Sequence, residues 1–548
     1  MCSSDLEKPW REALRRLERE RAVERIWSGD ATFWKKEPEH RRTIENALGW
    51  LTIPDRMAAT VPGLNDLAAR LTPGADRVLV LGMGGSSLAP LVFASSFGRS
   101  PGSPRLEVLD STEPSTVLAA AESAPPEKSI YVVSSKSGTT LEPNLFFDWF
   151  YAFARKELGE RAGERFVVIT DPGTPLEKLA KSRGVEATVL ADPAIGGRYS
   201  ALSPFGIVPA ALAGIDAGTL LDRARAEAAA CRTADPEQNP GAALGAAIGA
   251  LALEGRDKLT FATGAPVERF GMWLEQLIAE STGKEGKGIL PVEGEPLGAP
   301  EVYGDDRFFV RIASEGDASR EGELRSLAES GHPVVRYQIS DAFDLGAEMF
   351  RWEFATAIAG ALLGINPFDQ PNVQEAKDRT NEILAEKDPA AASAGDTDAR
   401  GISELLESIR PRDYFAITAY LPPTAENEQR LARIRLPVRD ARRVATTVGF
   451  GPRFLHSTGQ LHKGGPDTGV FLQVTASAAA RVPIPGRPWG FERVIAAQAA
   501  GDLAALRSRG RRALSVHLSE PSSGLDSLAE EIRRISARGA HSVAGERR

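Results

Sequence analysis

With 548 residues, the chain is long enough for two to four domains with sizeable cores. Its net charge of -8, with 42% hydrophobic and 26% charged residues, argues against broad binding to nucleic acid or to acidic membranes. Only Cys2 and Cys231 are present, so we expect neither a disulfide framework nor a cysteine zinc site. The histidine spacings suggest no metal site, and no apolar run is long enough to span a membrane. With no signal-peptide pattern at the start, these features predict a cytoplasmic protein without a metal.

Residues 1–75 form a charged segment of predicted helices, in which Arg and Glu alternate around apolar positions. Four tryptophans are expected to pack this segment against a neighbouring part of the chain: Trp10, Trp27, Trp34 and Trp50. The segment carries no pattern that indicates chemistry.

From residue 77 onward, apolar runs alternate with helical stretches. The first runs cover residues 77–83, 105–110, 130–134, 165–170 and 186–190. Strands that alternate with helices predict a parallel sheet with helices on its faces, which binds ligands at the carboxyl ends of its strands. We place the first such domain at residues 76–235.

A second series of strands is predicted at residues 257–263, 308–313, 334–339, 414–420 and 470–475. It indicates a second α/β domain of similar size, at residues 236–480. Residues 481–548 are expected to form a C-terminal extension, with a helix near 490–508 and a strand near 514–518. The sequence shows no internal repeat strong enough to prove duplication.

The stretch from Ser129 to Asn144 is the first candidate site. A predicted strand at 130–133 ends in small, hydroxylic and basic residues, and a helix is predicted from residue 141. Ser135, Ser137 and Thr140 offer hydroxyl donors and Lys136 offers an ammonium group. A polar turn between a strand and a helix can hold a phosphate dianion. An ordinary capped turn is the alternative.

A second glycine-serine turn follows the first predicted strand, and it includes Gly85 and Ser86. It resembles a dinucleotide fingerprint, but the last glycine is missing and serines fit a monophosphate better. We therefore expect no nucleotide cofactor. After the fifth predicted strand, two glycines precede Arg198 and would aim its guanidinium into a cleft, although a surface salt bridge is the commoner role of a single Arg.

The candidate general base lies in the stretch 268–288, where apolar residues follow helical periodicity. Gln276 and Glu280 are four residues apart and share one face. Glu280 falls beside Trp273 at the edge of the apolar stripe, a position that suits a general base. A surface pair on an amphipathic helix is the alternative. We expect residues 284–288 to form a flexible basic loop.

Two further clusters complete the candidates. Gln370 and Lys377 lie seven residues apart and can point the same way if a helix joins them. A glycine-rich stretch at 456–466 holds His456 and His462, and histidine titrates near neutral pH. Either histidine could instead be an ordinary hydrogen-bonded loop residue.

In combination, three motifs resemble the glucose-6-phosphate isomerase family: Gly-Gly-Arg-Tyr-Ser at 196–200, Glu-Ser-x-Gly-Lys at 280–284, and Phe-Asp-Gln at 368–370 followed by Lys377. The resemblance covers roughly residues 77–475. The stretch 456–466 and the tail are similar to the isomerase half of bacterial transaldolase/glucose-6-phosphate isomerase fusion proteins. The implied fold is α/β: two sugar-isomerase (SIS) domains, each a parallel sheet flanked by helices in an αβα sandwich. The implied reaction interconverts glucose 6-phosphate and fructose 6-phosphate without a metal or organic cofactor.

The resemblance also implies a role for each candidate residue. The phosphate would be bound by Ser135, Lys136, Ser137 and Thr140, helped by Gly85 and Ser86. Glu280 would carry the proton between C2 and C1, and Arg198 would stabilise the enediolate oxygens. Gln276 and Gln370 would orient hydroxyls, and Lys377 would assist ring opening.

The sequence departs from the family pattern at three places. Ser137-Gly138 stands where the family usually has Thr-Phe, and residues 372–374 read Asn-Val-Gln in place of Gly-Val-Glu. The ring-opening histidine normally lies between the base and the Phe-Asp-Gln motif, where this chain has only His332. We assign the role to His456 and keep His462 and His332 as alternatives. In the family this histidine comes from a neighbouring subunit, so a homodimer is implied.

Three other functions are alternatives to the implied isomerase activity. A noncatalytic phosphosugar-binding regulator would need a DNA-binding helix-turn-helix, and the N-terminal segment shows no convincing one. Amidotransferase-linked amino-sugar synthesis would need an N-terminal domain with a nucleophilic cysteine, for which the residues after Cys2 leave no room. The alternative that the enzyme is an isomerase that also converts mannose 6-phosphate is not decided by the sequence.

Overall fold

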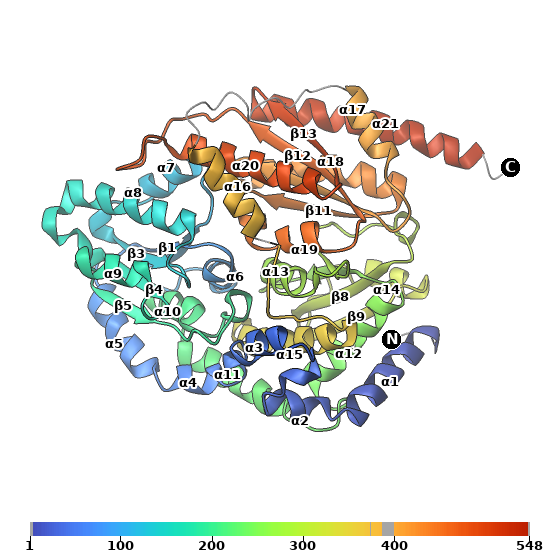
Figure 1. The fold of residues 1–548 in the computed structure, drawn as a ribbon, viewed down its shortest axis with the longest axis horizontal. Helices are drawn as coiled ribbons and strands as arrows, with labels where there is room; N and C mark the ends of the chain where they lie inside the picture. The colour runs from blue at the N-terminus through green and yellow to red at the C-terminus, as the bar shows by residue number, and fades with distance from the viewer. Residues whose placement is uncertain (1–3, 373, 386–398, 546–548) are drawn as a thin grey trace.

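The computed structural model describes residues 4–372, 374–385 and 399–545. It contains a five-stranded sheet and two four-stranded sheets, all parallel and flanked by helices (Figure 1). The predicted α/β class is confirmed. In that view the first sheet lies on the left, the second at the lower right and the third at the upper right. Among the described residues, no helix has the length and apolar character needed to cross a membrane.

The first sheet has the strand order β2-β1-β3-β4-β5. Its strands are β1 (Arg77–Leu81), β2 (Arg105–Leu109), β3 (Ser129–Ser134), β4 (Phe166–Thr170) and β5 (Ala187–Leu190). Its helices are α6 (Leu88–Phe97), α7 (Pro114–Glu122), α8 (Leu141–Leu158), α9 (Pro175–Ser182), α10 (Pro204–Leu212) and α11 (Ala217–Ala230). The strands β1, β3 and β4 are buried along their whole length, as expected of a parallel sheet covered on both faces.

The second sheet has the order β7-β6-β8-β9. Its strands are β6 (Lys258–Thr263), β7 (Leu290–Val292), β8 (Arg307–Ser314) and β9 (Val334–Ile339), and its helices are α12 (Pro240–Leu253), α13 (Phe270–Thr282), α14 (Glu321–Glu329) and α15 (Leu345–Leu363). Small residues on α12 let it approach α15 closely. A side chain at Gly245 would come within 2.6 Å of Ile358, so this approach depends on glycine.

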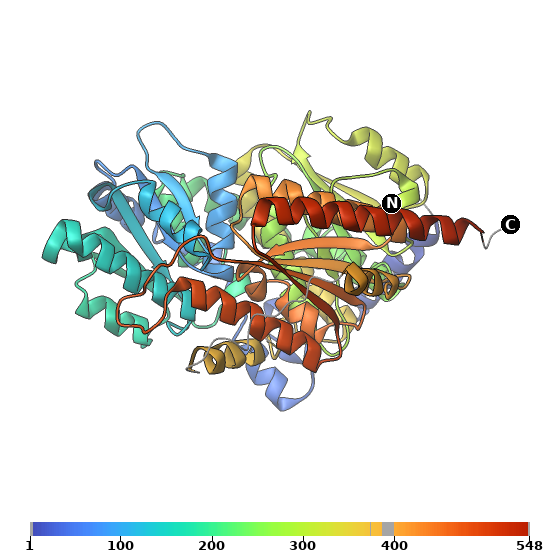
Figure 2. The same cartoon turned by 90° about the horizontal axis from the view of Figure 1, so that it is seen from above.

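The third sheet has the order β11-β10-β12-β13. Its strands are β10 (Tyr414–Tyr420), β11 (Ala445–Phe450), β12 (Gly469–Ala476) and β13 (Arg512–Leu518). The helices around it are α16 (Gln374–Ala385), α17 (Ala399–Glu407), α18 (Ala425–Arg442), α19 (Gly459–Gly464), α20 (Phe491–Ser508) and α21 (Pro521–Gly545). The end of α21 projects beyond the rest of the molecule (Figures 1 and 2).

The second predicted strand series is therefore divided between two sheets. Residues 258–339 supply the second sheet, whereas β10 and β12 pair with β11 and β13 in the third, which has its own apolar core. Periodicity reveals a strand but not its partners, because pairing depends on tertiary packing. The strand β13 and the helix α20 lie in the predicted C-terminal extension, so the boundary at residue 481 runs through the third unit. The domain limits themselves stay a prediction.

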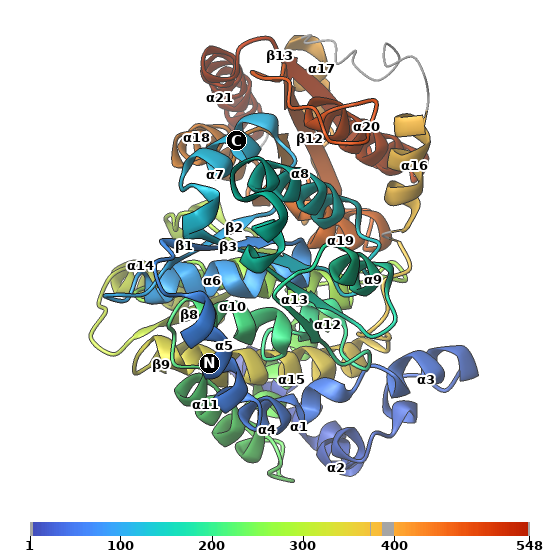
Figure 3. The same ribbon diagram turned by 90° about the vertical axis from the view of Figure 1, so that its left-hand side faces the viewer.

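The N-terminal helices are α1 (Ser4–Arg19), α2 (Ala22–Trp27), α3 (Pro38–Glu45), α4 (Ile53–Ala58) and α5 (Val61–Leu71). Figure 3 shows α1 to α4 at the bottom and the third sheet at the top. The indole groups of Trp10, Trp27 and Trp34 donate hydrogen bonds to carbonyls of residues 243, 231 and 357, at 3.1, 2.8 and 2.8 Å. Trp50 packs against Tyr199. The expected anchoring role of these tryptophans is confirmed.

Candidate active site

A cleft of about 320 Å³ lies where the first sheet, α16 and the third-sheet region meet. It is lined by Thr139, Thr140, Leu141, Glu142, Lys377, Thr380, Asn381, Leu455, His456, Gly459, Lys463 and Gln498. The cleft thus brings together the predicted phosphate loop, Lys377 and the predicted ring-opening histidine, which are far apart in the sequence.

The loop after β3 supplies hydroxyl groups at one end of the cleft. Ser135 is buried, and its hydroxyl has no hydrogen-bond partner among the described residues. The hydroxyls of Ser137 and Thr139 lie 2.9 Å apart. Thr140 immediately precedes α8, where backbone N–H groups favour an anion. Thr139 and Thr140 line the cleft, and a hydroxyl beside a helix N-terminus is suited to donate a hydrogen bond to a ligand oxygen.

Gly138 explains why this loop tolerates no bulky residue. Its φ is +64°, and a Cβ would lie 2.8 Å from the Cβ of Thr174 and 2.9 Å from that of Leu176. The departure from the family pattern is therefore a packing feature. Lys136 points elsewhere: its Nζ pairs with Asp171 and donates to the carbonyl of Pro193 at 3.1 Å.

The glycine turn after β1 contacts the other site elements directly. It forms the 3₁₀ turn η3 (Gly84–Ser86), and Ser86 is buried. A side chain at Gly85 would collide with the carbonyl oxygen of Gly197, so backbone lies against backbone there. A side chain at Gly84 would meet Gln276 and His456. The turn thus packs against the segments that carry Arg198, the candidate base and the candidate ring-opening residue.

Arg198 lies in the 3₁₀ turn η6 (Gly197–Tyr199), and only 2% of it is exposed. Its guanidinium donates to Ser281 Oγ at 2.8 Å, to Gln370 Oε1 at 3.0 Å, and to the carbonyls of residues 367 and 369 at 2.7 and 2.8 Å. Its Nη1 lies 3.4 Å from Glu280 Oε1. The planar fork is therefore fixed beside the candidate base.

Glu280 is buried on α13 between two polar partners. One carboxylate oxygen faces Arg198, and the other accepts from Gln276 Nε2 at 3.1 Å. The same amide nitrogen also donates to the carbonyl oxygen of His456 at 2.8 Å. Gln276 therefore joins the Arg198–Glu280 pair to His456, which lines the cleft.

The segment after α13 differs from the expected flexible basic loop at its first residue. Lys284 is buried, its Nζ lies 2.7 Å from Asp369 Oδ1, and it also bonds the carbonyl of Asp369. Burial and the charge of Arg198 lower the pKa of Lys284 to about 8. The contact with Asp369 holds the Phe-Asp-Gln motif against the end of α13.

His456 ends the 3₁₀ turn η10 (Arg453–His456) and faces the cleft. Its Nε2 lies 3.1 Å from Glu142 Oε1, which also accepts from Gln498 Nε2 at 2.7 Å. Burial alone would raise the pKa of Glu142, but the interactions with His456, a backbone hydrogen bond and the charge of Lys377 together outweigh it, so the pKa lies below its usual range. The imidazole is therefore oriented by an ionised carboxylate, and the charge of Lys377 also acts on Glu142.

The two alternative histidines pack against aromatic rings. His462 packs between Phe471, Tyr414 and Phe454, and burial places its pKa well below the usual value. His332 lies against Tyr303 and Phe309, and burial lowers its pKa as well. Of the three candidates, all within the described residues, His456 is the one that lines the cleft.

Two features of the site were not predicted from the sequence. Glu142 follows the recognised loop directly, but its link to His456 spans 314 positions. Lys463 lines the cleft and forms a buried ion pair with Asp502, at 2.6 Å.

The resemblance also implies a histidine from a neighbouring subunit, whereas here the histidine at Glu142 belongs to the same chain. The part of the chain that the structure describes contains no cluster of three acidic, His or Cys residues that could hold a metal.

The chain matches the family model described as Phosphoglucose isomerase over residues 72–289, a range that contains the 135–140 loop, Arg198 and Glu280. A glucose-6-phosphate isomerase of Rubrobacter xylanophilus is 30% identical over 392 residues, which cover 61% of this chain and 88% of the relative. The chain belongs to the glucose-6-phosphate isomerase family.

A second relative and two solved structures extend the match. The enzyme of Leptospira interrogans is 29% identical over 430 residues, covering 68% of this chain and 95% of the relative. A crystal structure of a hypothetical protein from Thermus thermophilus has a TM-score of 0.60 at 25% identity, and covers 70% of this chain and 99% of that one. A glucose-6-phosphate isomerase structure from Chlamydia trachomatis, at 20% identity, has a TM-score of 0.51 and supports the fold; it covers 71% of this chain and 81% of that chain.

Proposed function

We propose that this chain interconverts glucose 6-phosphate and fructose 6-phosphate through ring opening and proton transfer. The observation that carries the proposal is the buried Arg198–Glu280 pair, joined through Gln276 to a cleft that holds His456. A carboxylate beside a fixed guanidinium suits the removal of a proton next to a carbonyl, since the guanidinium stabilises the oxyanion that develops.

The phosphate would bind at the loop after β3. Ser135, Ser137 and Thr140 would donate hydroxyl groups, helped by the N-terminus of α8. Gly85 and Ser86 would contribute from the neighbouring turn. Lys136 would act through its charge, since its Nζ is held by Asp171. Binding the remote phosphate would position C1 and C2 for the reaction.

Ring opening requires a proton to leave one sugar oxygen and reach another. His456 would move this proton, because it lines the cleft and its Nε2 lies 3.1 Å from the carboxylate of Glu142, which orients the imidazole. Lys377 lines the same cleft and would assist. The open-chain aldose would then present its C2 proton to Glu280.

In the isomerisation step, Glu280 would remove the proton from C2 and return it to C1. The enediolate formed between these events carries negative charge on its oxygens, which Arg198 would stabilise. Gln276 and Gln370 would orient sugar hydroxyls, although each now bonds a protein group that the substrate would have to replace or share. The reaction is redox-neutral overall, because C1 is reduced as C2 is oxidised within the same sugar, and Glu280 would return to C1 the proton that it takes from C2.

The test is a coupled spectrophotometric assay of Glu280→Gln with fructose 6-phosphate. The amide keeps the shape but cannot take a proton, so kcat should fall by about 10²- to 10⁴-fold. Binding of a competitive sugar-phosphate inhibitor should change little. A variant with near-normal turnover would refute the assignment of the base.

We also propose a homodimer, which the family resemblance supports, and a cytoplasmic location, which the composition supports. The 456–466 stretch resembles the isomerase half of transaldolase fusion proteins. Activity on mannose 6-phosphate is the alternative specificity, because Gly138 replaces a bulky residue at the phosphate loop. The same assay with mannose 6-phosphate distinguishes the two.

A further inference from the structure

The turn that carries His456 is attached to the first sheet at two points. Arg453, the first residue of η10, makes two contacts of 2.7 Å with the carboxylate of Asp110, which directly follows β2. His456 itself bonds Glu142 at the start of α8. These contacts fix the turn relative to the phosphate-binding half of the site.

The same turn is also attached to α13, through two neighbouring residues of the helix and two neighbouring residues of the turn. Ser457 Oγ donates to Glu275 Oε1 at 3.1 Å, while Gln276 donates to the carbonyl of His456. Two consecutive residues of the helix thus bond two consecutive residues of the turn. Because α13 also carries Glu280, this double contact sets the position of the imidazole relative to the base.

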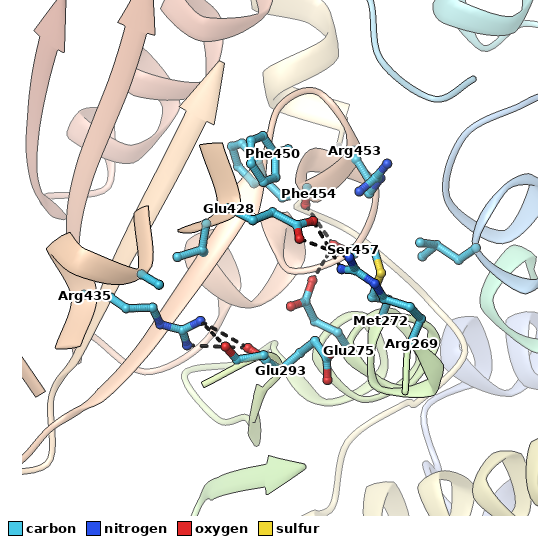
Figure 4. A pocket seen from close by; sticks show the side chains of 15 residues that line it. Arg269, Met272, Glu275, Glu293, Glu428, Arg435, Phe450, Arg453, Phe454 and Ser457 are labelled. Carbon is cyan, nitrogen blue, oxygen red and sulfur yellow. Dashed lines mark hydrogen bonds and ion pairs between the residues drawn. The ribbon is translucent and has the colours of Figure 1, made fainter. Parts of the chain in front are cut away.

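A cavity of about 130 Å³ lies directly behind this contact (Figure 4). In the figure, the carboxylate of Glu275 points toward Ser457, and Arg269 points toward Glu428. Three other charged residues that line the cavity already have partners: Arg269 pairs with Glu428, and Arg453 pairs with Asp110. Ser457 therefore supplies the hydrogen bond that holds the Glu275 carboxyl group in this cavity.

We propose that the Ser457–Glu275 hydrogen bond positions His456 for ring opening. The inference rests on the proposed isomerase function and deepens it. Neither Ser457 nor Glu275 would touch the substrate. Both act through the turn that carries His456, and Gln276 and Arg453 hold this turn at its other contacts. Loss of the contact should slow ring opening more than proton transfer, because Glu280 and Arg198 keep all their own partners.

The experiment uses Ser457→Ala and a substrate deuterated at C2. A misplaced imidazole should lower kcat for glucose 6-phosphate by about tenfold to a hundredfold. Since ring opening would then limit the rate, the kinetic isotope effect at C2 should fall toward one. Exchange between the α and β anomers, measured by two-dimensional exchange NMR, should slow in parallel, because anomers exchange through ring opening alone.

The cavity gives room for a water molecule to replace the lost hydroxyl, so the variant is expected to fold. Ser515→Ala is the matched control, since Ser515 is also buried and donates to Gln473 at 3.0 Å in the third sheet. It should leave kcat and the isotope effect unchanged. Glu275→Gln keeps an acceptor for Ser457 and should retain the isotope effect, whereas Glu275→Ala should behave as Ser457→Ala.

Each other result would overturn the inference. An unchanged kcat in Ser457→Ala would show that the contact positions nothing. A lower kcat with an unchanged isotope effect would indicate a general loss of active protein, and a larger isotope effect would place the defect at proton transfer. Wild-type protein without turnover would instead refute the proposed function, which separates the two failures.

Discussion

The imidazole of His456 lies 3.1 Å from the carboxylate of Glu142, although the two residues are 314 positions apart. Glu142 lies at the start of α8, next to the predicted phosphate loop, and His456 belongs to the third-sheet region. The contact therefore links the place where a sugar phosphate would be held to the group that would open its ring.

Replacement of Glu142 tests this link. In Glu142→Gln the negative charge beside the imidazole of His456 is lost, while a hydrogen-bond acceptor remains. We expect kcat to fall by about tenfold to a hundredfold, with KM nearly unchanged. Steady-state kinetics with glucose 6-phosphate measures both values, and an equal loss with the exposed Glu329→Gln control would contradict the prediction.

Arg198→Lys should show how much the site depends on the guanidinium fork. A lysine keeps the charge but cannot reach Ser281, Gln370 and Glu280 together. We expect kcat/KM to fall by about 10²- to 10³-fold. The exposed Arg70→Lys is the matched control, and retention of wild-type kcat/KM in the Arg198 variant would argue against oxyanion stabilisation by this residue.

The close contact of the two glycine turns predicts a strong effect at Gly85. In Gly85→Ala the new methyl group would collide with the carbonyl of Gly197 and displace the turn that carries Arg198. Overpacking of this kind costs about 1–3 kcal/mol, so both the unfolding free energy and kcat should fall. Gly63→Ala is the control, because a side chain there meets nothing within 4 Å and lies in the helix α5. Urea unfolding and the kinetic assay decide the outcome.

The cavity behind Ser457 predicts a dependence of stability on pH. Burial, followed by the charge of Glu293, raises the pKa of Glu275 to about 8, and burial raises the pKa of Glu293 to about 7. In the unfolded chain both groups ionise near the ordinary value of 4.5. A raised acid pKa contributes stability below 4.5 that is lost as pH rises through 7 and 8.

Glu275→Gln should therefore reduce the fall in melting temperature between about pH 5 and pH 9. Thermal unfolding at several pH values, with the exposed Glu329→Gln as control, measures the difference. A parallel pH dependence in the variant and the wild type would show that Glu275 does not titrate in this range.

Much of the candidate site could be predicted from the sequence, and the reasons are local. Glu280 and Gln276 share a helix face because of their four-residue spacing, and both lie together in the structure. The hydroxyl-rich loop after β3 follows from an apolar run that ends abruptly. Arg198 was found from its two preceding glycines, one of which packs against the other glycine turn.

The parts that were missed depend on contacts between distant segments. Nothing near Glu142 in the sequence indicates that His456 would reach it. Lys284 was expected in a flexible loop, yet Asp369, 85 positions away, makes its burial possible. The third sheet escaped prediction for the same reason: residues 414–420 and 470–475 have the pattern of strands, but only packing decides that they pair with β11 and β13 rather than with the second sheet.

One chain brings His456 and Glu280 together, since Gln276 bonds both residues, and this arrangement has a genetic consequence. Where a site is shared between subunits, two inactive variants can restore each other when mixed, because some hybrid assemblies contain one intact site. Here a chain that lacks the glutamate and a chain that lacks the histidine would each form a defective site. No site in a mixed assembly would contain both residues. Co-expression of the two variants should leave the cell without rescue.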